Sequence, residues 1–266
     1  MKARAIFLLL IVAAATLRAQ EKPDPAREKM VERLNGIMLT AVHMTEAKMT
    51  DVAEFFEKKA LVIEHLDPGD GRVALKVAVK DDGAGRLAAA RVNYATGEIP
   101  LSEALRYAAE ETGSKLVVDG EGVAFVPLDG YKGGVPPSLP PSLLSPRAQE
   151  EGRKQMQAKL DQIVIPKISF RQAKLRDALE FLHRKAFELD TSASAKGAIW
   201  GVSIVLIQYP APENDNTPAP GDTQISLEAA DMSLDAALKE IARLSGMKMT
   251  VEPYAVVFRP DTQQQK

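Results

Sequence analysis

The chain has 266 residues, enough for two domains of about 100 residues each, and its 34 Lys+Arg against 36 Asp+Glu give a net charge of −2. This balance offers no general attraction to phosphate backbones, so nucleic acid is a poor default partner. The chain has no cysteine, which excludes disulfides, thiol nucleophiles and a lipid on an N-terminal cysteine.

Residues 1–19 have the pattern of a secretory signal peptide. Lys2 and Arg4 precede an apolar run of 13 residues, 5–17, and Ala19 is a small residue suited to cleavage. The run is shorter than the ~20 residues that cross a membrane, although a retained anchor is an alternative. We therefore expect an exported, periplasmic protein, peripheral to the outer membrane at most, with no integral span after signal removal.

The sequence repeats itself. Residues 27–64 align without a gap on 153–190 with 11 identities in 38 positions, an offset of 126. Residues 101–127 align on 234–260 with 10 identities in 27, an offset of 133. The extra seven residues (133 − 126) fit the polar stretch 209–222, because insertions collect in loops. Two long blocks in the same order predict two copies of one folded unit.

Each unit is predicted to open with a helix that begins after a capping residue and a proline, at Asp24-Pro25 and Ser145-Pro146. A strand follows at 37–44 or 163–170. Apolar residues at three- and four-residue spacing then predict an amphipathic helix in each copy. Its apolar positions are Met49, Val52, Ala53, Phe56 and Ala60 in the first copy and Leu175, Ala178, Leu179, Leu182 and Ala186 in the second.

The rest of each unit is predicted to add strands and a second helix. The strands are 73–79 and 91–97, or 202–208 and 224–230. The helix spans 101–112 or 234–245 and ends at Gly113 or Gly246. Two closing strands meet at a turn containing Asp119-Gly120 or Glu252-Pro253. The predicted fold is α+β, with two tandem β-α-β-β-α-β-β modules, each a small mixed sheet covered by two helices and each preceded by a helix.

The proline-rich segment between the copies predicts a semi-rigid linker. Five prolines lie between residues 136 and 146, where they disfavour helices and central strands. The expected organisation is a signal peptide at 1–19, modules at 24–128 and 146–262, and a linker at 129–145 that separates them.

The second copy resembles the periplasmic N-domains of secretins and the related short domain at the N-terminus of some TonB-dependent receptors. The resemblance rests on two patterns of core residues: Ala173, Leu175, Ala178, Leu179, Leu182 and Ile225, Leu227, Leu234, Ala237, Leu238. It covers 163–260 well and 37–127 less well, where Val52-Ala53 replaces the family's Ala-Leu. These positions are specific for fold, not for activity.

The resemblance implies non-enzymatic modules that stack or dock partner proteins in the cell envelope. We expect a free-standing pair of modules that serves a secretin, a type IV pilus or another transport assembly. Its partners would be envelope proteins or further copies of itself, bound at open strand edges. The alternative is a signalling module that binds a regulator, as in TonB-dependent receptors. An enzyme of unrecognised type is a third class, which a deep pocket with convergent polar groups would favour.

No catalytic, cofactor or metal site is predicted. The histidines His43, His65 and His183 lack metal-ligand spacing, and His183 is expected to be solvated on its helix. Glycine-rich 67–72 and 81–86 are interpreted as turns, and 213–216 as a mobile hairpin loop. Ser192 and Ser194 lack a catalytic spacing to Lys196. The sole tryptophan, Trp200, is expected to pack in the core or at a sheet edge.

Overall fold

The computed structural model describes residues 24–40, 42–64, 74–80, 83, 85–191, 201–209 and 219–261. Within them the chain is a mixture of α-helices and small sheets, which confirms the predicted α+β class. Several expectations lie outside the described residues: the signal peptide 1–19, His65, the turn 67–72, residues 192–200 with Ser192, Ser194, Lys196 and Trp200, and the loop 213–216.

The first half of the molecule runs from α1 to β9. Its helices are α1 (Pro25–Gly36), α2 (Met49–Ile63), the short α3 (Arg86–Ala89) and α4 (Leu101–Glu111). Its strands are β1 (Met38–Leu39), β2 (Val42–His43), β3 (Ala47–Lys48), β4 (Lys76–Val79), β5 (Arg91–Val92), β6 (Ala95–Thr96), β7 (Ile99–Pro100), β8 (Ser114–Val118) and β9 (Gly122–Pro127).

The second half runs from α5 to β14. Its helices are α5 (Pro146–Gln162), α6 (Leu175–Leu189) and α7 (Leu234–Ser245), with a 3-10 turn at Pro220–Asp222. Its strands are β10 (Val164–Lys174), β11 (Ile204–Leu206), β12 (Gln224–Ser233), β13 (Met247–Val251) and β14 (Val256–Pro260).

Elements of the two halves recur at the offsets of the sequence repeat. Helix α6 begins and ends 126 residues after α2 (175 − 49 and 189 − 63), and α7 begins 133 residues after α4 (234 − 101). The pairing recurs too, because β4 runs parallel to β9, as β11 does to β14, and β8 and β13 complete the two sheets antiparallel. Each half thus has a three-stranded mixed sheet of the same strand order.

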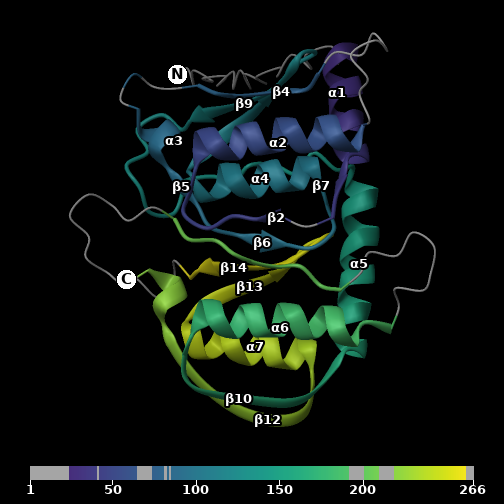
Figure 1. Cartoon of the computed structure of the whole chain (residues 1–266), viewed down its shortest axis with the longest axis vertical. Helices are drawn as coiled ribbons and strands as arrows, with labels where there is room; N and C mark the ends of the chain where they lie inside the picture. Colours follow the sequence, from purple (N-terminus) through teal and green to yellow (C-terminus); the bar gives the residue numbers. More distant parts are fainter. Residues whose placement is uncertain are drawn as a thin grey trace, which may run out of the picture.

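The helices of each half lie between two β layers, where we expected one sheet with helices on a single face. In the second half α6 and α7 are flanked by the mixed sheet on one side and by a two-stranded antiparallel ribbon, β10–β12, on the other (Figure 1). In the first half the ribbon is split into the pairs β1–β7, β2–β6 and β3–β5. The single-sheet expectation fails because the strand before each first helix pairs only with the strand before the second.

The predicted helix faces and caps are confirmed. All ten apolar positions named for α2 and α6 are buried. Asp24 accepts a hydrogen bond from the amide of Ala26, and Ser145 accepts one from Ala148, so each cap satisfies an otherwise unpaired helical N–H. Gly246 ends α7 with a φ of 66°, in the left-handed region that favours glycine.

The two halves share a hydrophobic core. Side chains alternate across the pleated sheet of the second half, so its strands bury both faces. Ile204, Leu206, Val256 and Phe258 pack with α6 and α7, whereas Val205, Ile207, Ala255 and Val257 belong to the core of the first half. The mixed sheet of the second half therefore contributes one face to each core, and it lies between the two halves in Figure 1.

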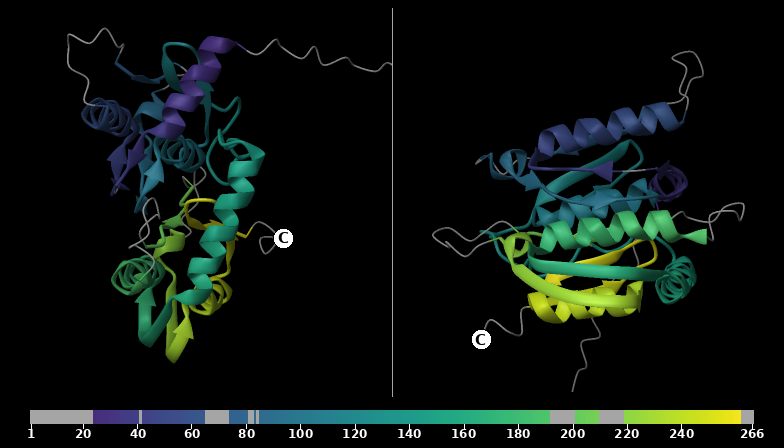
Figure 2. Two further views of the ribbon diagram at one scale, coloured as in Figure 1. Left: turned by 90° about the vertical axis from the view of Figure 1, so that its right-hand side faces the viewer. Right: turned by 60° about the horizontal axis from the view of Figure 1, so that its bottom comes forward.

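The proline-rich segment packs against the first half instead of holding the halves apart. Leu143 packs against the core of the first half, Leu144 is buried, and the Ser142 hydroxyl donates to Glu103 of α4 at 2.6 Å. Helix α5 then runs down the side of the second half (Figure 1, Figure 2). The halves thus contact each other directly, and the segment 129–145 follows a fixed path beside their junction.

Candidate functional site at the junction of the two halves

Helix α4 lies in the centre of the molecule and is buried on every side. All eleven of its residues, Leu101–Glu111, are buried, including four charged ones. An amphipathic helix on a domain surface would expose those charges to water. The burial follows from the position of α4, between the core of the first half and the β13–β14 hairpin of the second.

Five charged side chains from both halves meet there and form what we call the junction ion cluster. It contains Glu103, Arg106 and Glu110 of α4 together with Glu252 and Arg259 of the second half. Arg106 donates to Glu103 at 2.8 Å and also to Glu252. Arg259 binds Glu110 through both Nε and Nη2, the latter at 2.8 Å, and reaches Glu252 at 2.7 Å.

The cluster satisfies its own charges. Glu252 accepts from both arginines and from the Tyr107 hydroxyl at 3.0 Å, while the Tyr209 hydroxyl donates to Glu110 at 3.1 Å. Burial alone raises the pKa of Glu252, but Arg106 and Arg259 outweigh it and the net shift is downward. These groups hold their charges in a buried setting because they are paired, which joins the halves by directional contacts.

Glu111, the last residue of α4, is a buried carboxyl outside this cluster. Its Oε2 accepts from the amide of Asn93 at 2.9 Å, whereas its Oε1 has no hydrogen-bond partner among the described residues. Burial raises the pKa of Glu111 to about 8, with Glu46 and Glu110 adding to the shift. Glu111 is thus largely protonated at neutral pH, which lowers the cost of its burial.

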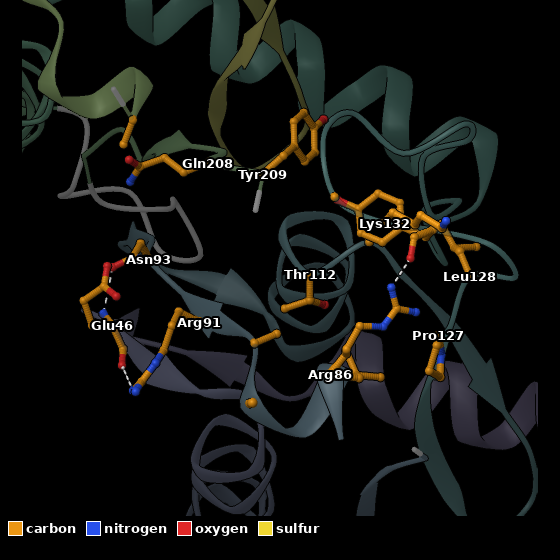
Figure 3. Close-up of a pocket in the computed structure, with 17 residues that line it drawn as sticks. Glu46, Arg86, Arg91, Asn93, Thr112, Pro127, Leu128, Lys132, Gln208 and Tyr209 are labelled. Carbon is orange, nitrogen blue, oxygen red and sulfur yellow. Dashed lines mark hydrogen bonds between the residues drawn. The ribbon is translucent and has the colours of Figure 1, made fainter. Parts of the chain in front are cut away.

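A cavity of about 560 Å³ opens beside this end of α4, between the halves (Figure 3). Arg86, Arg91 and Lys132 supply positive charge to its wall, and Tyr131 and Tyr209 supply aromatic surface. Arg91 donates to the backbone oxygen of Glu46 at 2.8 Å, and Arg86 donates to the backbone oxygen of Tyr131, so both guanidinium groups are held in place. Among the described residues of the wall, Glu46 is the one acid.

The cavity is chemically suited to holding a small anionic molecule. A guanidinium group presents five N–H donors, and the bond from Arg91 to Glu46 uses only one of its donors. Asn93 and Gln208 add amide groups to the wall, and the phenol rings offer flat apolar contact. The polar groups in this wall suit a small ligand, and such a site is compatible with a docking role for the outer surfaces.

The structure brings together two histidines that the sequence keeps far apart. His43 of the first half and His183 of α6 line a second cavity of about 450 Å³ on another side of the junction. His183 is not solvated as expected, because Nδ1 lies 3.0 Å from the carbonyl oxygen of Val202 and the ring is half-buried. Burial lowers the pKa of His183 below its ordinary value. The expectation failed because the second half's sheet and the first half cover that side of α6.

Sequence reasoning did not find the junction. No catalytic, cofactor or metal residue was predicted, and 101–112 was predicted only as a helix, so the burial of Glu103, Arg106, Glu110 and Glu111 was not anticipated. One signal was present: at the positions of Tyr107, Glu110 and Glu111 the second copy has Glu240, Arg243 and Leu244, so the two helices differ on that face.

A comparison of the chain with known protein families, curated proteins and solved structures finds no match. None of the helices in the described ranges combines the length and apolar composition that crossing a bilayer requires. Within the same ranges, no group of three or more His, Asp or Glu residues is placed to hold a metal ion.

Proposed function

We propose that this chain is an exported, non-enzymatic adaptor built from two tandem secretin N-domain-like modules, residues 24–128 and 146–262. It docks on or stacks against partner proteins of an envelope assembly, such as a secretin or a type IV pilus system. In this account the modules act as one rigid block that presents strand edges to a partner.

The recurrence of elements carries the proposal. Helices α2 and α6, α4 and α7, and the two mixed sheets recur at offsets of 126 and 133 residues, which are those of the sequence repeat. A duplicated unit whose apolar residues hold it together has its outer surfaces available for recognition. This supports a modular docking protein, in line with the family that the second copy resembles.

The junction ion cluster supports rigidity. Its bidentate Arg259–Glu110 contact and the Arg106–Glu252 contact fix orientation as well as distance between the halves. A pre-organised block loses less conformational entropy when it binds than two loosely joined modules would. Rigid spacing between two docking surfaces is useful to an adaptor.

The open ribbon of the second half supports docking. Strands β10 and β12 pair only with each other among the described residues, over 11 and 10 residues. Each therefore presents a row of unpaired backbone groups along its outer edge. Such an edge is a ready template for a strand of another protein.

Capture from envelope extracts tests the proposal. The full chain, tagged at its C-terminus, would be cross-linked in extracts of the source organism, with the unfolded Leu182→Asp protein as a control. We expect a secretin or pilus component to be enriched on the folded protein alone. Recovery of the same proteins on both baits would contradict the adaptor role, and specific recovery of a transcriptional regulator would favour signalling instead.

A further inference from the structure

A groove lies along the outer edge of β10 where that strand passes α6. It has a volume of about 480 Å³ and is lined by the β10 positions 167, 169, 170 and 173 and by the α6 positions 177, 178, 181 and 184. The right-hand view of Figure 2 shows β10 between α6 and β12, with α6 beside its free edge. The groove therefore combines a strand edge with a helix flank.

The hydrogen-bond register shows which backbone groups face the groove. The amide of Leu175 donates to the carbonyl of Thr223 at 2.8 Å, and the register continues through Ala173–Ile225 and Phe170–Leu227 to Ile168–Ala229. Because backbone groups alternate sides along an antiparallel strand, Ile168 and Phe170 bond toward β12. Lys167 and Ser169, which line the groove, then direct their N–H and C=O groups outward.

The floor of the groove is apolar. Phe170 and Phe181 meet edge to face with their ring centroids 5.4 Å apart, and Phe181 is only half-buried. Ala173 and Ala178 keep the floor shallow enough for side chains of an added strand. Such a strand would cover the flank of α6 that the two-stranded ribbon leaves open.

Charge decides which occupant fits. The ionisable residues of β10 are all basic, Lys167, Arg171 and Lys174, and Arg184 of α6 adds a fourth positive charge at the groove. Arg171 and Lys174 have acidic partners in Glu228 and Asp222. Lys167 and Arg184 lie exposed at the groove, where Asp177 is the one acid within the described part of the chain. A second copy would bring like charges together at this edge, which is unfavourable.

We propose that this groove binds an extended, acidic and apolar segment of a partner protein, which adds to the sheet as a strand beside β10. Its main chain bonds to Lys167 and Ser169, its apolar side chains cover Phe181, and its carboxylates lie beside the side chains of Lys167 and Arg184. This inference rests on the adaptor function proposed above and assigns its docking site.

A peptide titration followed by amide NMR tests the site. The probe is an acetylated and amidated hexapeptide of alternating glutamate and valine, titrated into the full chain labelled with ¹⁵N. We expect the largest shifts at Lys167, Ser169 and Phe181. A lysine–valine peptide of the same length and a glutamate–valine peptide with N-methylated valines should bind at least about tenfold more weakly, since the first loses charge attraction and the second loses main-chain donors.

Charge reversal provides matched variants. The double variant Lys167→Glu, Arg184→Glu should weaken binding of the glutamate–valine peptide about tenfold or more. The control is the double variant Lys239→Glu, Lys248→Glu, which makes the same change in charge on exposed residues of α7 and β13. It should bind the glutamate–valine peptide as the unmodified protein does. All of these positions are solvent-exposed, so folding is expected to persist and is checked by the spectrum itself.

Several outcomes would overturn the inference. They are an absence of shifts along β10, equal binding of the lysine–valine or N-methylated peptide, and equal loss in both double variants. Concentration-dependent dimerisation that protects the amides of Lys167 and Ser169 would identify a second copy as the occupant instead. If envelope capture succeeds and is unchanged by the Lys167, Arg184 double variant, this site is wrong while the adaptor function stands. If the peptide binds as predicted but capture fails, the function falls and the groove stands.

Discussion

Helices α4 and α7 occupy corresponding places in the two halves, yet α4 is buried on every side, whereas α7 exposes one face to solvent. Leu234, Ala237, Leu238, Ile241 and Ala242 of α7 are buried, whereas Lys239 and Arg243 are exposed and pair along the helix with Asp235 and Glu240. On α4 the equivalent positions carry Arg106 and Glu110 of the junction ion cluster. The corresponding helices thus have different roles: α7 lies at the surface of the second half, whereas α4 connects the two halves.

The difference arises from what lies next to each helix. The mixed sheet of the second half covers α4 with its outward face, and nothing in the described chain does the same for α7. Charged side chains at equivalent positions affect stability little when their ion pairs are exposed to water, and much more when water is excluded. Matched substitutions in the two halves therefore separate the properties of the unit from those of the junction.

The largest expected effect comes from a charge placed in a core. Leu182 of α6 and its counterpart Phe56 of α2 are both fully buried. Leu182→Asp or Phe56→Asp should each cost about 4 kcal/mol or more, because the carboxyl is buried without a partner. Since the cores share a wall, we expect both halves to lose hydrogen-exchange protection together. Arg184→Asp, on the exposed side of α6, is the control, and its stability should change little. Loss of hydrogen-exchange protection in one half alone would contradict the shared core.

The second largest effect on stability is expected from a substitution in the junction ion cluster. Glu110→Gln leaves the Arg259 guanidinium without its bidentate carboxylate, and we expect a loss of about 3 kcal/mol in urea denaturation. Arg243→Gln, the corresponding change in α7, removes only an exposed pair and should have no measurable effect. Equal effects of the two substitutions would show that the cluster does not hold the halves together.

A pH-dependent effect is expected from Glu111, whose counterpart in α7 is Leu244. The folded pKa of about 8 lies above the ordinary value of 4.5, so the folded state binds the proton more tightly than the unfolded chain. The contribution of Glu111 is complete below about pH 4.5 and is lost as the pH rises through 8. We expect a decline on the order of 3 kcal/mol between pH 5 and 9.

Urea denaturation across that pH range, repeated on Glu111→Gln, measures this contribution. The variant keeps a neutral polar group at every pH, so its stability should vary less than that of the unmodified protein. A curve as steep as that of the unmodified protein would mean that Glu111 is ionised in the fold at neutral pH.

The smallest effects are expected at the glycines that follow α4 and α7. Gly113 has a φ of 60° and Gly246 one of 66°, both in the left-handed region. Gly246→Ala should cost about 1 kcal/mol through backbone strain. A Cβ on Gly113 would lie 2.0 Å from Cε1 of Tyr131, so Gly113→Ala should cost more. Thermal melts of the two variants compare the sites, and equal shifts would mean that the Tyr131 ring moves aside freely.

The elements were predictable from the sequence because each one depends on local pattern. The spacing of Leu175, Ala178 and Leu182 predicted the buried face of α6, and Asp24-Pro25 predicted the start of α1. The duplication strengthened these predictions, since each element could be recognised twice.

The junction was not predictable because it depends on how elements far apart in the chain meet. Glu110 and Arg259 are 149 residues apart, and Arg106 and Glu252 are 146 apart. When helix α4 is considered alone, its charged side chains would be expected to face solvent. The ribbon was missed for a related reason, since periodicity identifies a strand but does not say which strand pairs with it.

Calorimetry of the full chain tests most directly whether the two halves fold as one unit. The account predicts a single unfolding transition whose calorimetric and van't Hoff enthalpies agree, and which moves as a whole to lower temperature in Glu110→Gln. Two separate transitions, or a single one unmoved by Glu110→Gln, would contradict it.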